Sequence, residues 1–459
     1  MRHVNHCGIA PTLRRMQTRR KAVVAALDVG TSKITCLFAQ LKPQAPQEVL
    51  PRRTHGIEIL GFGHISSRGI KAGAIVDFHQ AEEALRQAIA LAERSASLEV
   101  ESIVVSMSAG SIASEVVTAS VNVAGTVSND NVAQVLAKAY QNSMAHDRTI
   151  LHMLPIGYTV DNTRGIRNPR TMLAGRLGVN MHIVNVDAAI ARNLLLAVQS
   201  CHVAVGTITA SPYTAGLAVL ADDEADVGAA VVDMGAGTTT IAVFHGGRFV
   251  HADGFAVGGR HVTMDLARGL SVDLVDAERL KISYGVKASG AMISVPQIDD
   301  VGHESERMVS RSAVVRIVRA RIEEIVEILR DRLTASPFAN VPRGQVVLTG
   351  GASQLPGLTE LASSILNRPV RIGRPLGIAG LPPQAKGPAF AAAAGLLVFP
   401  QVVDREYFEY FERRGRQLVT GATDYIGRVC TMASREIVKI RKSIADGGII
   451  GKSLKTRNR

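Results

Sequence analysis

The sequence lacks the features that would suggest a membrane-spanning or secreted protein. No apolar run reaches the ~18 residues that cross a bilayer. The longest candidate, 389–399, is short and alanine-rich, which favours a buried helix. Four scattered cysteines, Cys7, Cys36, Cys201 and Cys430, show no CxxC spacing and indicate free thiols in a reducing compartment. The basic N-terminus has no continuous apolar stretch, so we do not expect a secretory signal.

Acidic residues are absent from one tail and outnumbered in the other. Residues 1–21 carry six Lys or Arg and no acid, and residues 401–459 carry thirteen Lys or Arg against seven acids. The tails therefore account for the whole net charge of +12, and the body is neutral. A nucleic-acid enzyme would carry basic residues across its body, so this distribution argues against nucleic acid as a partner. It favours a tethering role for the tails.

What the sequence does contain is a strand–turn–strand pattern with an acid before its glycines. In 230–244 an apolar strand ends at Asp233, a turn carries Gly235 and Gly237, and a second apolar strand follows three threonines. Glycines can adopt positive φ and allow a ligand to approach the backbone. Successive N–H groups in such a turn hold phosphate oxygens. Asp233 is then placed to reach a phosphate-bound Mg²⁺ or its water.

The same order of residues occurs 205 residues earlier. In 24–38 a strand ends at Asp28 and the turn holds Gly30, followed by hydroxyl residues, Lys33 and a second strand. One Asp-x-Gly hairpin alone is more often an ordinary turn. Two in matching order predict two similar halves that face each other across a nucleotide.

A third candidate wall of this cleft follows another apolar strand. Residues 346–349 end at Gly350 and Gly351, 117 residues after Asp233, and a helix is expected over 357–366. Glycines at a strand end let a flat ring or a phosphate lie on the backbone, and a helix N-terminus favours an anion.

These three segments resemble the phosphate-1, phosphate-2 and adenosine motifs of the actin, Hsp70 and sugar-kinase superfamily. Over about residues 22–400 the chain resembles the FtsA family of bacterial cell-division proteins. The local matches are Gly69–Asp77, Gly165–Pro169, Cys201 after the Asp187 helix, Asp276–Lys281 and Leu348–Leu358.

The resemblance implies an α/β, actin-like (ribonuclease H-like) fold of two lobes with an FtsA-type inserted subdomain. The expected segments are a disordered basic tail (1–21), subdomain 1A (22–107), the inserted subdomain 1C (108–182), the return to 1A with subdomain 2A (183–259), subdomain 2B (260–336), the return to 2A (337–400), a linker (401–423), an amphipathic membrane helix (424–446) and a basic tail (447–459).

The resemblance also implies a site for ATP and Mg²⁺. Asp28 and Asp233 would face Mg²⁺ through water. The phosphates would lie between two sets of residues: Gly30, Thr31, Ser32 and Lys33 on one side, and Gly235, Gly237, Thr238 and Thr239 on the other.

The nucleoside would lie against other residues. Glu278 and Lys281, at i and i+3 of one helix, would reach the ribose and adenine, with a surface ion pair as the alternative. The residues expected to line the adenine are Gly350, Gly351 and Ser353.

Hydrolysis needs a residue that orients the attacking water. Asp187 and Asp233 are the catalytic candidates, although Asp187 can equally be a helix cap. The expectation is an ATP-binding switch that is at most a weak ATPase.

The C-terminal segment has isoleucines and valine at helical spacing. These apolar positions are Ile426, Val429, Ile437, Ile440 and Ile444, with Arg and Lys on the other face. A basic amphipathic helix of this kind binds an anionic membrane surface; a core or partner-packing helix is the alternative. FtsA-like chains end in such a helix, but this one lacks Trp and Phe.

The helix expected over 312–333 corresponds to the family's receptor for the C-terminal peptide of FtsZ. Arg321 and Glu324 match the contact positions, and a solvated structural face is the alternative. Head-to-tail self-association and recruitment of later divisome proteins through the insert are further implications.

The leading hypothesis is an actin-like protein that attaches FtsZ filaments to the cytoplasmic side of the inner membrane at the division septum. A sugar or acid kinase of the same superfamily is the alternative, which the basic tail does not support. An Hsp70-like chaperone would need a peptide-binding domain after residue 400, where only 59 residues remain.

Overall fold

Two β-sheets of matching topology organise the protein. The computed structural model describes residues 21–45, 47–50, 53–143, 147–287, 292–298, 304–403 and 406–407. The chain divides into two units, residues 1–408 and 409–459, and every described residue belongs to the first. The predicted N-terminal tail up to residue 20, membrane helix and C-terminal tail lie outside the described residues, as does nearly all of the linker.

The first lobe is built on a six-stranded sheet of order β11-β6-β1-β2-β3-β19. Its strands are β1 (Ala22–Val29), β2 (Lys33–Pro43), β3 (His55–Ser66), β6 (Ser102–Met107), β11 (Ala204–Ala210) and β19 (Ile378–Ala379). The helices of this lobe are α1 (Phe78–Ala96), α3 (Ala188–Gln199), α4 (Ser211–Val219) and α10 (Ala391–Val398), with short 3₁₀ turns η3 (Pro383–Lys386), η4 (Pro388–Phe390) and η5 (Phe399–Gln401). A small hairpin, β4 (Ile70–Lys71) and β5 (Ala74–Ile75), precedes α1.

The second lobe uses the order β18-β17-β12-β13-β14 within a nine-stranded sheet. Its strands are β12 (Ala229–Met234), β13 (Thr239–His245), β14 (Arg248–Phe255), β17 (Gln345–Thr349) and β18 (Val370–Ile372). Around them are α5 (Asp222–Val227), α6 (Gly259–Leu270), α7 (Leu274–Tyr284), α8 (Arg311–Ala335), η1 (Pro337–Asn340), η2 (Gly351–Gln354) and α9 (Leu358–Leu366), with the hairpin β15 (Met292–Ile298) and β16 (Glu304–Ser310).

The two sheets repeat the same register as well as the same order. β1 pairs antiparallel with β2 so that Asp28 lies opposite Thr35, and β12 pairs with β13 so that Asp233 lies opposite Thr240. Both pairs of positions are offset by the 205 residues seen in the sequence. Each acid-bearing strand also has a parallel neighbour, β6 or β17, on its other side. The predicted duplication is therefore confirmed at the level of hydrogen-bond register.

An additional α/β unit extends the second sheet. It consists of β7 (Ala113–Thr126), α2 (Asn129–Asn142), β8 (Arg148–Val160), β9 (Thr163–Ile166) and β10 (Leu173–Asp187). β7 joins β14 through the single residue pair Ala113 and Asp253. The sequence over 165–179 predicts a loop-rich stretch, but this is wrong from Leu173 onward, because β10 begins there. Pairing with both β7 and β8 overrides the weak strand propensity of its glycines and polar residues.

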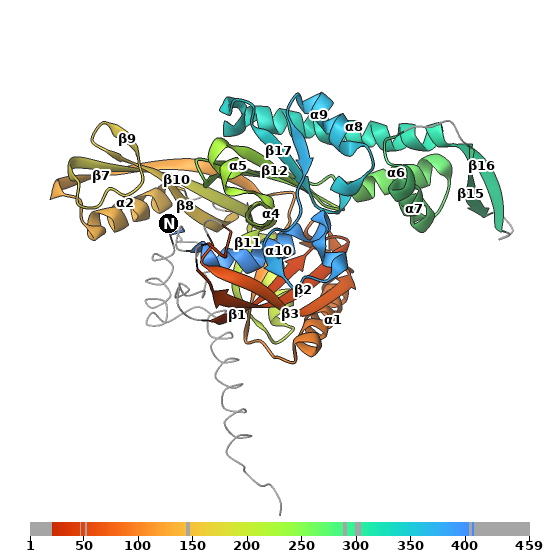
Figure 1. Ribbon diagram of the computed structural model, residues 1–459, viewed down its shortest axis with the longest axis horizontal. Coiled ribbons are helices and arrows are strands. Elements are labelled where there is room, and N and C mark those ends of the chain that lie inside the picture. Colours follow the sequence, from red (N-terminus) through yellow and green to blue (C-terminus); the bar gives the residue numbers. More distant parts are fainter. Residues whose placement is uncertain are drawn as a thin grey trace, which may run out of the picture. The chain divides into compact units, whose positions relative to one another are not determined.

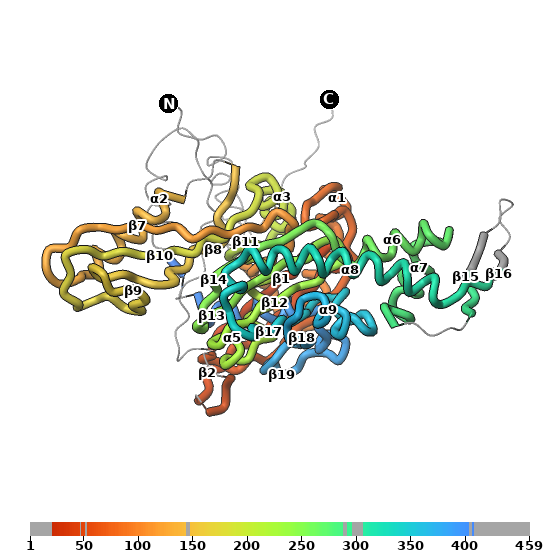
Figure 2. The backbone as a smooth tube through the Cα atoms, turned by 90° about the horizontal axis from the view of Figure 1, so that it is seen from above, coloured from red at the N-terminus to blue at the C-terminus, as the bar shows by residue number. Residues whose placement is uncertain are grey.

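The helices follow the apolar periodicity of the sequence. In 77–96 the helical spacing of apolar residues predicts that Ala81, Leu85, Ala88, Ile89 and Ala92 share one buried face. Asp77 caps α1, and all five residues are buried. The same spacing in 312–333 predicts a buried stripe on α8, and the structure buries it: Val315, Val318, Ile322, Ile325, Val326 and Leu329. Figure 2 shows α8 running from the second sheet to α6 and α7, against which it packs.

One predicted cap is wrong. Serine is a common N-cap, so the sequence predicts that Ser271 caps a helix starting at Val272, but Ser271 ends α6 in a left-handed conformation with φ 52°. The helix α7 starts at Leu274, and Asp273 caps it by accepting the Asp276 N–H at 2.7 Å. Two cap-forming residues stand two positions apart in the sequence, and the end of the preceding helix decides between them.

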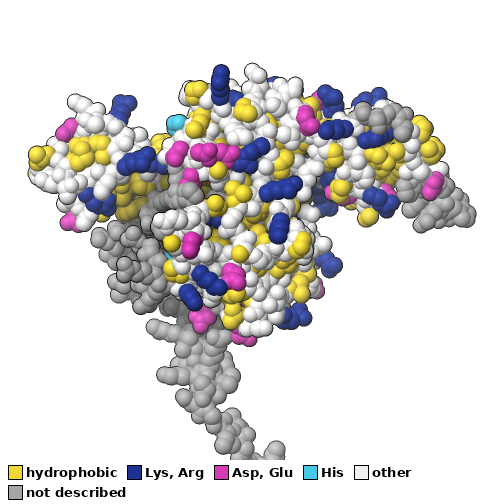
Figure 3. Space-filling view, in the orientation of Figure 1, with side chains coloured by type: hydrophobic (Ala, Val, Ile, Leu, Met, Phe, Trp, Pro, Cys, Tyr) yellow, Lys and Arg dark blue, Asp and Glu magenta, His cyan; other side chains and the backbone are white. Residues whose placement is uncertain are grey.

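The surface is in keeping with a neutral body. On the face shown in Figure 3, Lys and Arg side chains are interspersed with Asp and Glu across both lobes. Among the described residues, no helix combines the length and the apolar character needed to cross a membrane.

α10 lies against α4, which also contacts β12 and β13 of the second lobe (Figure 1). A Cβ on Gly395 of α10 would lie 1.7 Å from the carbonyl oxygen of Thr214 in α4.

Gly395→Ala should therefore lower the free energy of unfolding by about 1–3 kcal/mol, although alanine favours a helix intrinsically. Urea denaturation measures this. In the control Gly157→Ala, the new Cβ meets only Gly165 Cα at 3.9 Å, and a change under about 0.5 kcal/mol is expected. Equal effects of the two substitutions would contradict the close approach.

Candidate functional site

The two Asp-x-Gly turns have the same internal geometry. The Gly30 N–H donates to the Lys33 carbonyl at 3.0 Å, and the Gly235 N–H donates to the Thr238 carbonyl at 2.9 Å. A Cβ on either glycine would lie 3.0 Å from the carbonyl that accepts its bond. These glycines are needed for close approach. The expectation of positive φ at Gly235 and Gly237 is wrong, since neither is among the positive-φ glycines.

The turns lie against each other. A Cβ on Gly237 would be 2.7 Å from the Thr31 hydroxyl of the first turn. The Thr238 hydroxyl lies 2.9 Å from that of Ser108, just after β6. Thr31 and Thr238 are both buried. The structure thus brings together residues that are more than 200 positions apart in the chain, as the duplicated hairpins predict.

Asp28 and Asp233 stand at the ends of β1 and β12, and their environments raise the pKa of both carboxyls. For Asp28 the cause is burial, opposed by the hydroxyl of Ser106, which donates to Oδ1, and by the charge of Lys33. For Asp233 burial is again the largest cause and the negative charge of Asp28 the second, and together they raise its pKa to about 7. The positive charge of Lys33 therefore acts on both acids.

A site with two carboxylates, one buried and one partly buried, and one ammonium fits an added divalent cation. Mg²⁺ is held in proteins by one or two carboxylates together with phosphate oxygens and waters. The described residues contain no cluster of three His, Cys, Asp or Glu that would form an all-protein metal cage. The donor set of Asp28 and Asp233 therefore matches Mg²⁺ brought with a phosphate ligand.

Gly350 closes the site beside Asp233. It has φ 84°, and a Cβ there would lie 2.4 Å from Asp233 Oδ1. Gly351 next to it is exposed, and a Cβ on it would meet nothing within 4 Å. The buried Ser353 donates its hydroxyl to the Gly350 carbonyl at 2.8 Å, so it holds this turn together. Open space over Gly351 is where a flat ring could lie.

The second turn also receives the start of α6. The N–H groups of Gly259 and Arg260 donate to the carbonyls of Gly235 and Ala236 at 2.9 and 2.8 Å. Nothing in the sequence predicts this contact, because Gly258-Gly259 resembles an ordinary loop before a helix.

Glu278 and Lys281 are placed next to that contact. Lys281 is buried and donates to the Gly259 carbonyl at 3.1 Å, the Thr263 hydroxyl at 3.0 Å and Glu278 Oε2 at 2.6 Å. The ion-pair alternative is thus realised, although only Glu278 is at the surface. Their predicted role in binding ribose and adenine stays a prediction.

Asp187 caps α3. Its Oδ1 accepts the N–H groups of Ala189 and Ile190 at 2.8 and 3.2 Å. This is the capping role that the sequence left open, and the catalytic role stays a prediction.

Ser106 and Phe390 are two site residues that sequence reasoning missed. Ser106 binds Asp28 from the parallel neighbour β6. Phe390 lies under the Lys33 ammonium, with Nζ 3.6 Å from its ring centroid. A serine after a buried apolar strand was a usable signal for Ser106, because parallel strands end at one edge of a sheet. Phe390 is 357 positions from Lys33, and no local pattern points to it.

The predicted partner residues are engaged within the protein. Arg321 of α8 donates to both carboxylate oxygens of Asp265 in α6, at 2.6 and 3.3 Å, and also bonds Glu324. Arg321 therefore ties two helices together and is partly exposed. Its predicted contact with a peptide stays a prediction.

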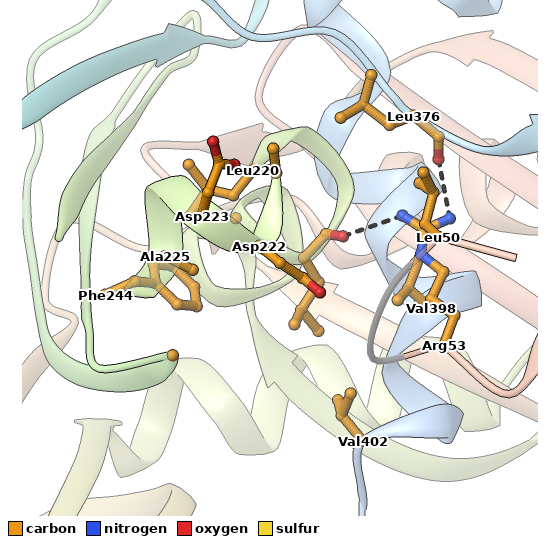
Figure 4. A pocket seen from close by; sticks show the side chains of 14 residues that line it. Leu50, Arg53, Leu220, Asp222, Asp223, Ala225, Phe244, Leu376, Val398 and Val402 are labelled. Atoms are coloured by element: carbon orange, nitrogen blue, oxygen red, sulfur yellow. Dashed lines mark hydrogen bonds between the residues drawn. The ribbon is translucent and has the colours of Figure 1, made fainter. Parts of the chain in front are cut away.

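A separate cavity of about 440 Å³ is lined by residues of α4, α5, the loop before β3 and the end of α10 (Figure 4). Arg53 spans it, donating to the carbonyls of Leu376 and Leu217 at 2.9 and 3.3 Å. Its lining contains none of the residues predicted to bind nucleotide.

Solved structures with this fold are actin-like. A chain of the PilM–PilN type IV pilus biogenesis complex superposes with a TM-score of 0.58 at 16% identity, covering 82% of this chain and 98% of that one. MreB5 of Spiroplasma citri bound to ADP gives 0.50 at 13% identity, covering 85% and 98%. These likenesses confirm the predicted actin-like α/β fold.

Sequence comparisons identify the family. The family model described as cell division protein FtsA matches residues 230–395, and the one described as the SHS2 domain inserted in FtsA matches 109–185. Cell division protein FtsA of Agrobacterium fabrum is 49% identical over 408 residues, covering 88% of this chain and 92% of the relative. That of Neisseria meningitidis is 32% identical over 386 residues, covering 83% and 90%. The chain belongs to the FtsA family of cell division proteins.

Proposed function

We propose that this chain is an ATP-binding switch that tethers FtsZ filaments to the cytoplasmic side of the inner membrane at the division septum. The observation that carries the proposal is the pair of abutting turns whose acids, Asp28 and Asp233, share Lys33. Such a pair suits a polyphosphate with its Mg²⁺, and the structural neighbour from Spiroplasma is described as bound to ADP.

The residues of the two turns would hold the phosphates from both lobes. Those of the first turn are Gly30, Thr31, Ser32 and Lys33, and those of the second are Gly235, Gly237, Thr238 and Thr239. Mg²⁺, when bound, would neutralise phosphate charge between Asp28 and Asp233. Glu278 and Lys281 of α7 would approach the ribose and adenine beside the start of α6, with the ring over Gly350 and Gly351.

Hydrolysis is proposed to be weak at most. Asp187 is the proposed residue for orienting water, but its Oδ1 already accepts two backbone N–H groups. A nucleotide-dependent switch in self-association therefore explains the site better than rapid turnover.

Attachment is proposed to use two surfaces. Residues 424–446 would lie on the anionic leaflet through Ile426, Val429, Ile437, Ile440 and Ile444. Arg321 and Glu324 on α8 would receive the FtsZ C-terminal peptide. Head-to-tail contacts between copies would produce filaments, since a heterologous contact repeats without closing. The inserted subdomain would recruit later divisome proteins.

The raised pKa of Asp233 makes Mg²⁺–ATP binding depend on pH. Because Mg²⁺ requires the ionised carboxylate, affinity should rise between about pH 6 and pH 8, and fall roughly tenfold per pH unit well below the pKa. Calorimetric titration in buffers of different ionisation enthalpy measures both affinity and proton release. Asp233→Asn should bind at least about tenfold more weakly and lose the pH dependence.

The same residue gives a test without ligand. With its pKa raised in the folded state, Asp233 holds its proton longer there than in the unfolded chain. Its contribution to the free energy of unfolding therefore falls as pH rises from about 4 to about 7. Asp233→Asn should remove that part of the slope. A wild-type affinity that is flat with pH and unchanged by Asp233→Asn would sink the cleft assignment.

Arg321→Ala should weaken binding of an FtsZ C-terminal peptide by about tenfold, since truncated arginines are common hot spots. Fluorescence anisotropy with a labelled peptide measures this. Arg319→Ala is the matched control, because Arg319 pairs with Glu323 on its own helix at 2.7 Å. Asp265→Asn breaks the tie to α6 but keeps Arg321. If Asp265→Asn reproduced the whole loss, the cause would be helix packing and not contact with the peptide.

Deletion of 424–459 should abolish co-sedimentation with anionic liposomes while leaving ATP binding intact. Deletion of only 447–459 should retain binding, because the expected amphipathic helix ends at 446. Ile440→Asp should act like the larger deletion, since a charge on the apolar face opposes insertion. Binding that survives the larger deletion would place the membrane contact elsewhere in the chain.

A further inference from the structure

The 3₁₀ turn η4 bonds both lobes through consecutive carbonyl groups. The Pro388 carbonyl accepts the Gly350 N–H at 3.1 Å and the Thr349 hydroxyl at 3.0 Å, both from the end of β17. The next carbonyl, that of Ala389, accepts Lys33 Nζ from the first turn. Pro388 and Ala389 thus contact both the proposed phosphate-binding turn and the proposed adenine-binding glycines.

The ring of Phe390 makes the second contact with the Lys33 ammonium. Lys33 Nζ lies 3.6 Å from the ring centroid, a cation–π distance. Phe390 is itself held from β3, with its ring centroid 5.4 Å from that of His64 and 6.2 Å from that of Phe62. The ring of Phe390 is buried, whereas Lys33 is partly exposed. An aromatic face held this way offers one fixed position to a flexible lysine side chain.

The Lys33 side chain needs such contacts to hold its ammonium in one position. Its ammonium has three donors and four single bonds of rotational freedom behind it. Asp28 and Asp233, one from each lobe, both act on its charge. Without these fixed contacts the ammonium would pair with one of the two carboxylates and would no longer be placed to bind phosphate. With one donor on the Ala389 carbonyl and the ring beneath it, its other donors stay available to an incoming anion.

We propose that Phe390 and the Ala389 carbonyl are positioning groups that hold the Lys33 ammonium for a nucleoside polyphosphate. Through η4, phosphate binding at Lys33 then changes the strength of the Gly350 N–H hydrogen bond. This rests on the proposed nucleotide site. When phosphate oxygens accept from the remaining donors of Lys33, its bond to the Ala389 carbonyl weakens, while the bonds of η4 to β17 remain. The hydrogen bond at Gly350 is then the one whose strength reports phosphate occupancy.

A double-mutant cycle tests the positioning role. Phe390→Leu keeps an apolar side chain but removes the ring, and should weaken ATP binding by about five- to thirtyfold. Phe390→Tyr, which keeps the ring, should stay within about threefold of wild type. In a Lys33→Met background the effect of Phe390→Leu on ATP affinity should vanish, because nothing is left to position. An effect of the same size in both backgrounds would mean that Phe390 only packs, and would overturn the proposal.

Amide exchange at Gly350 provides a readout that needs no nucleotide. In the ligand-free protein, Phe390→Leu and Lys33→Met should each accelerate exchange of the Gly350 N–H several-fold, and Phe390→Tyr should not. In the wild type, ATP should change that exchange rate. If the wild type bound no ATP but the ligand-free exchange pattern held, the nucleotide site would fail while the coupling of Lys33 to Gly350 stood. Exchange that ignores both substitutions would overturn the coupling.

Discussion

The structure depends on two acids from different lobes that both act on the charge of one partly buried ammonium, that of Lys33. Asp28 and Asp233 each sit at the end of a central strand, and burial raises the pKa of both. Two carboxylates facing one lysine are costly to bury, and added positive charge relieves the cost. A cation that arrives with phosphate is proposed to supply that charge. The two sheets place the acids at the ends of matching strands.

The two halves have the same backbone but different electrostatics. Ser106 and Thr349 occupy equivalent positions beside Asp28 and Asp233 on the parallel neighbouring strands. The Ser106 hydroxyl donates to Asp28, whereas the Thr349 hydroxyl donates to the carbonyls of Gly373 and Pro388. Asp233 therefore lacks the hydroxyl bond that lowers the pKa of Asp28. The duplicated framework therefore gives its two acids different hydrogen-bond partners.

Contacts around the site are made by backbone at close range, which explains the glycines. Gly350 cannot carry a Cβ beside Asp233, Gly237 cannot carry one beside Thr31, and Gly395 cannot carry one where α10 meets α4. In each case the neighbour belongs to another segment of the chain. Side-chain volume at these positions would separate the turns, the third wall or the lobe-connecting helices, so the glycines set the spacing of the site.

The sequence by itself determined the duplicated hairpins, the insert, the buried stripes of α1 and α8 and the acids of the site, because these depend on local periodicity and on a repeat offset of 205 residues. It did not determine that Ser271 ends one helix and Asp273 starts the next, or that residues from 173 onward form a strand, because neighbouring elements decide between equal local preferences. Only the tertiary structure placed Phe390 beneath Lys33 and turned Arg321 toward Asp265. Those contacts join residues far apart in the chain, and side-chain packing between elements leaves no periodic mark in the sequence.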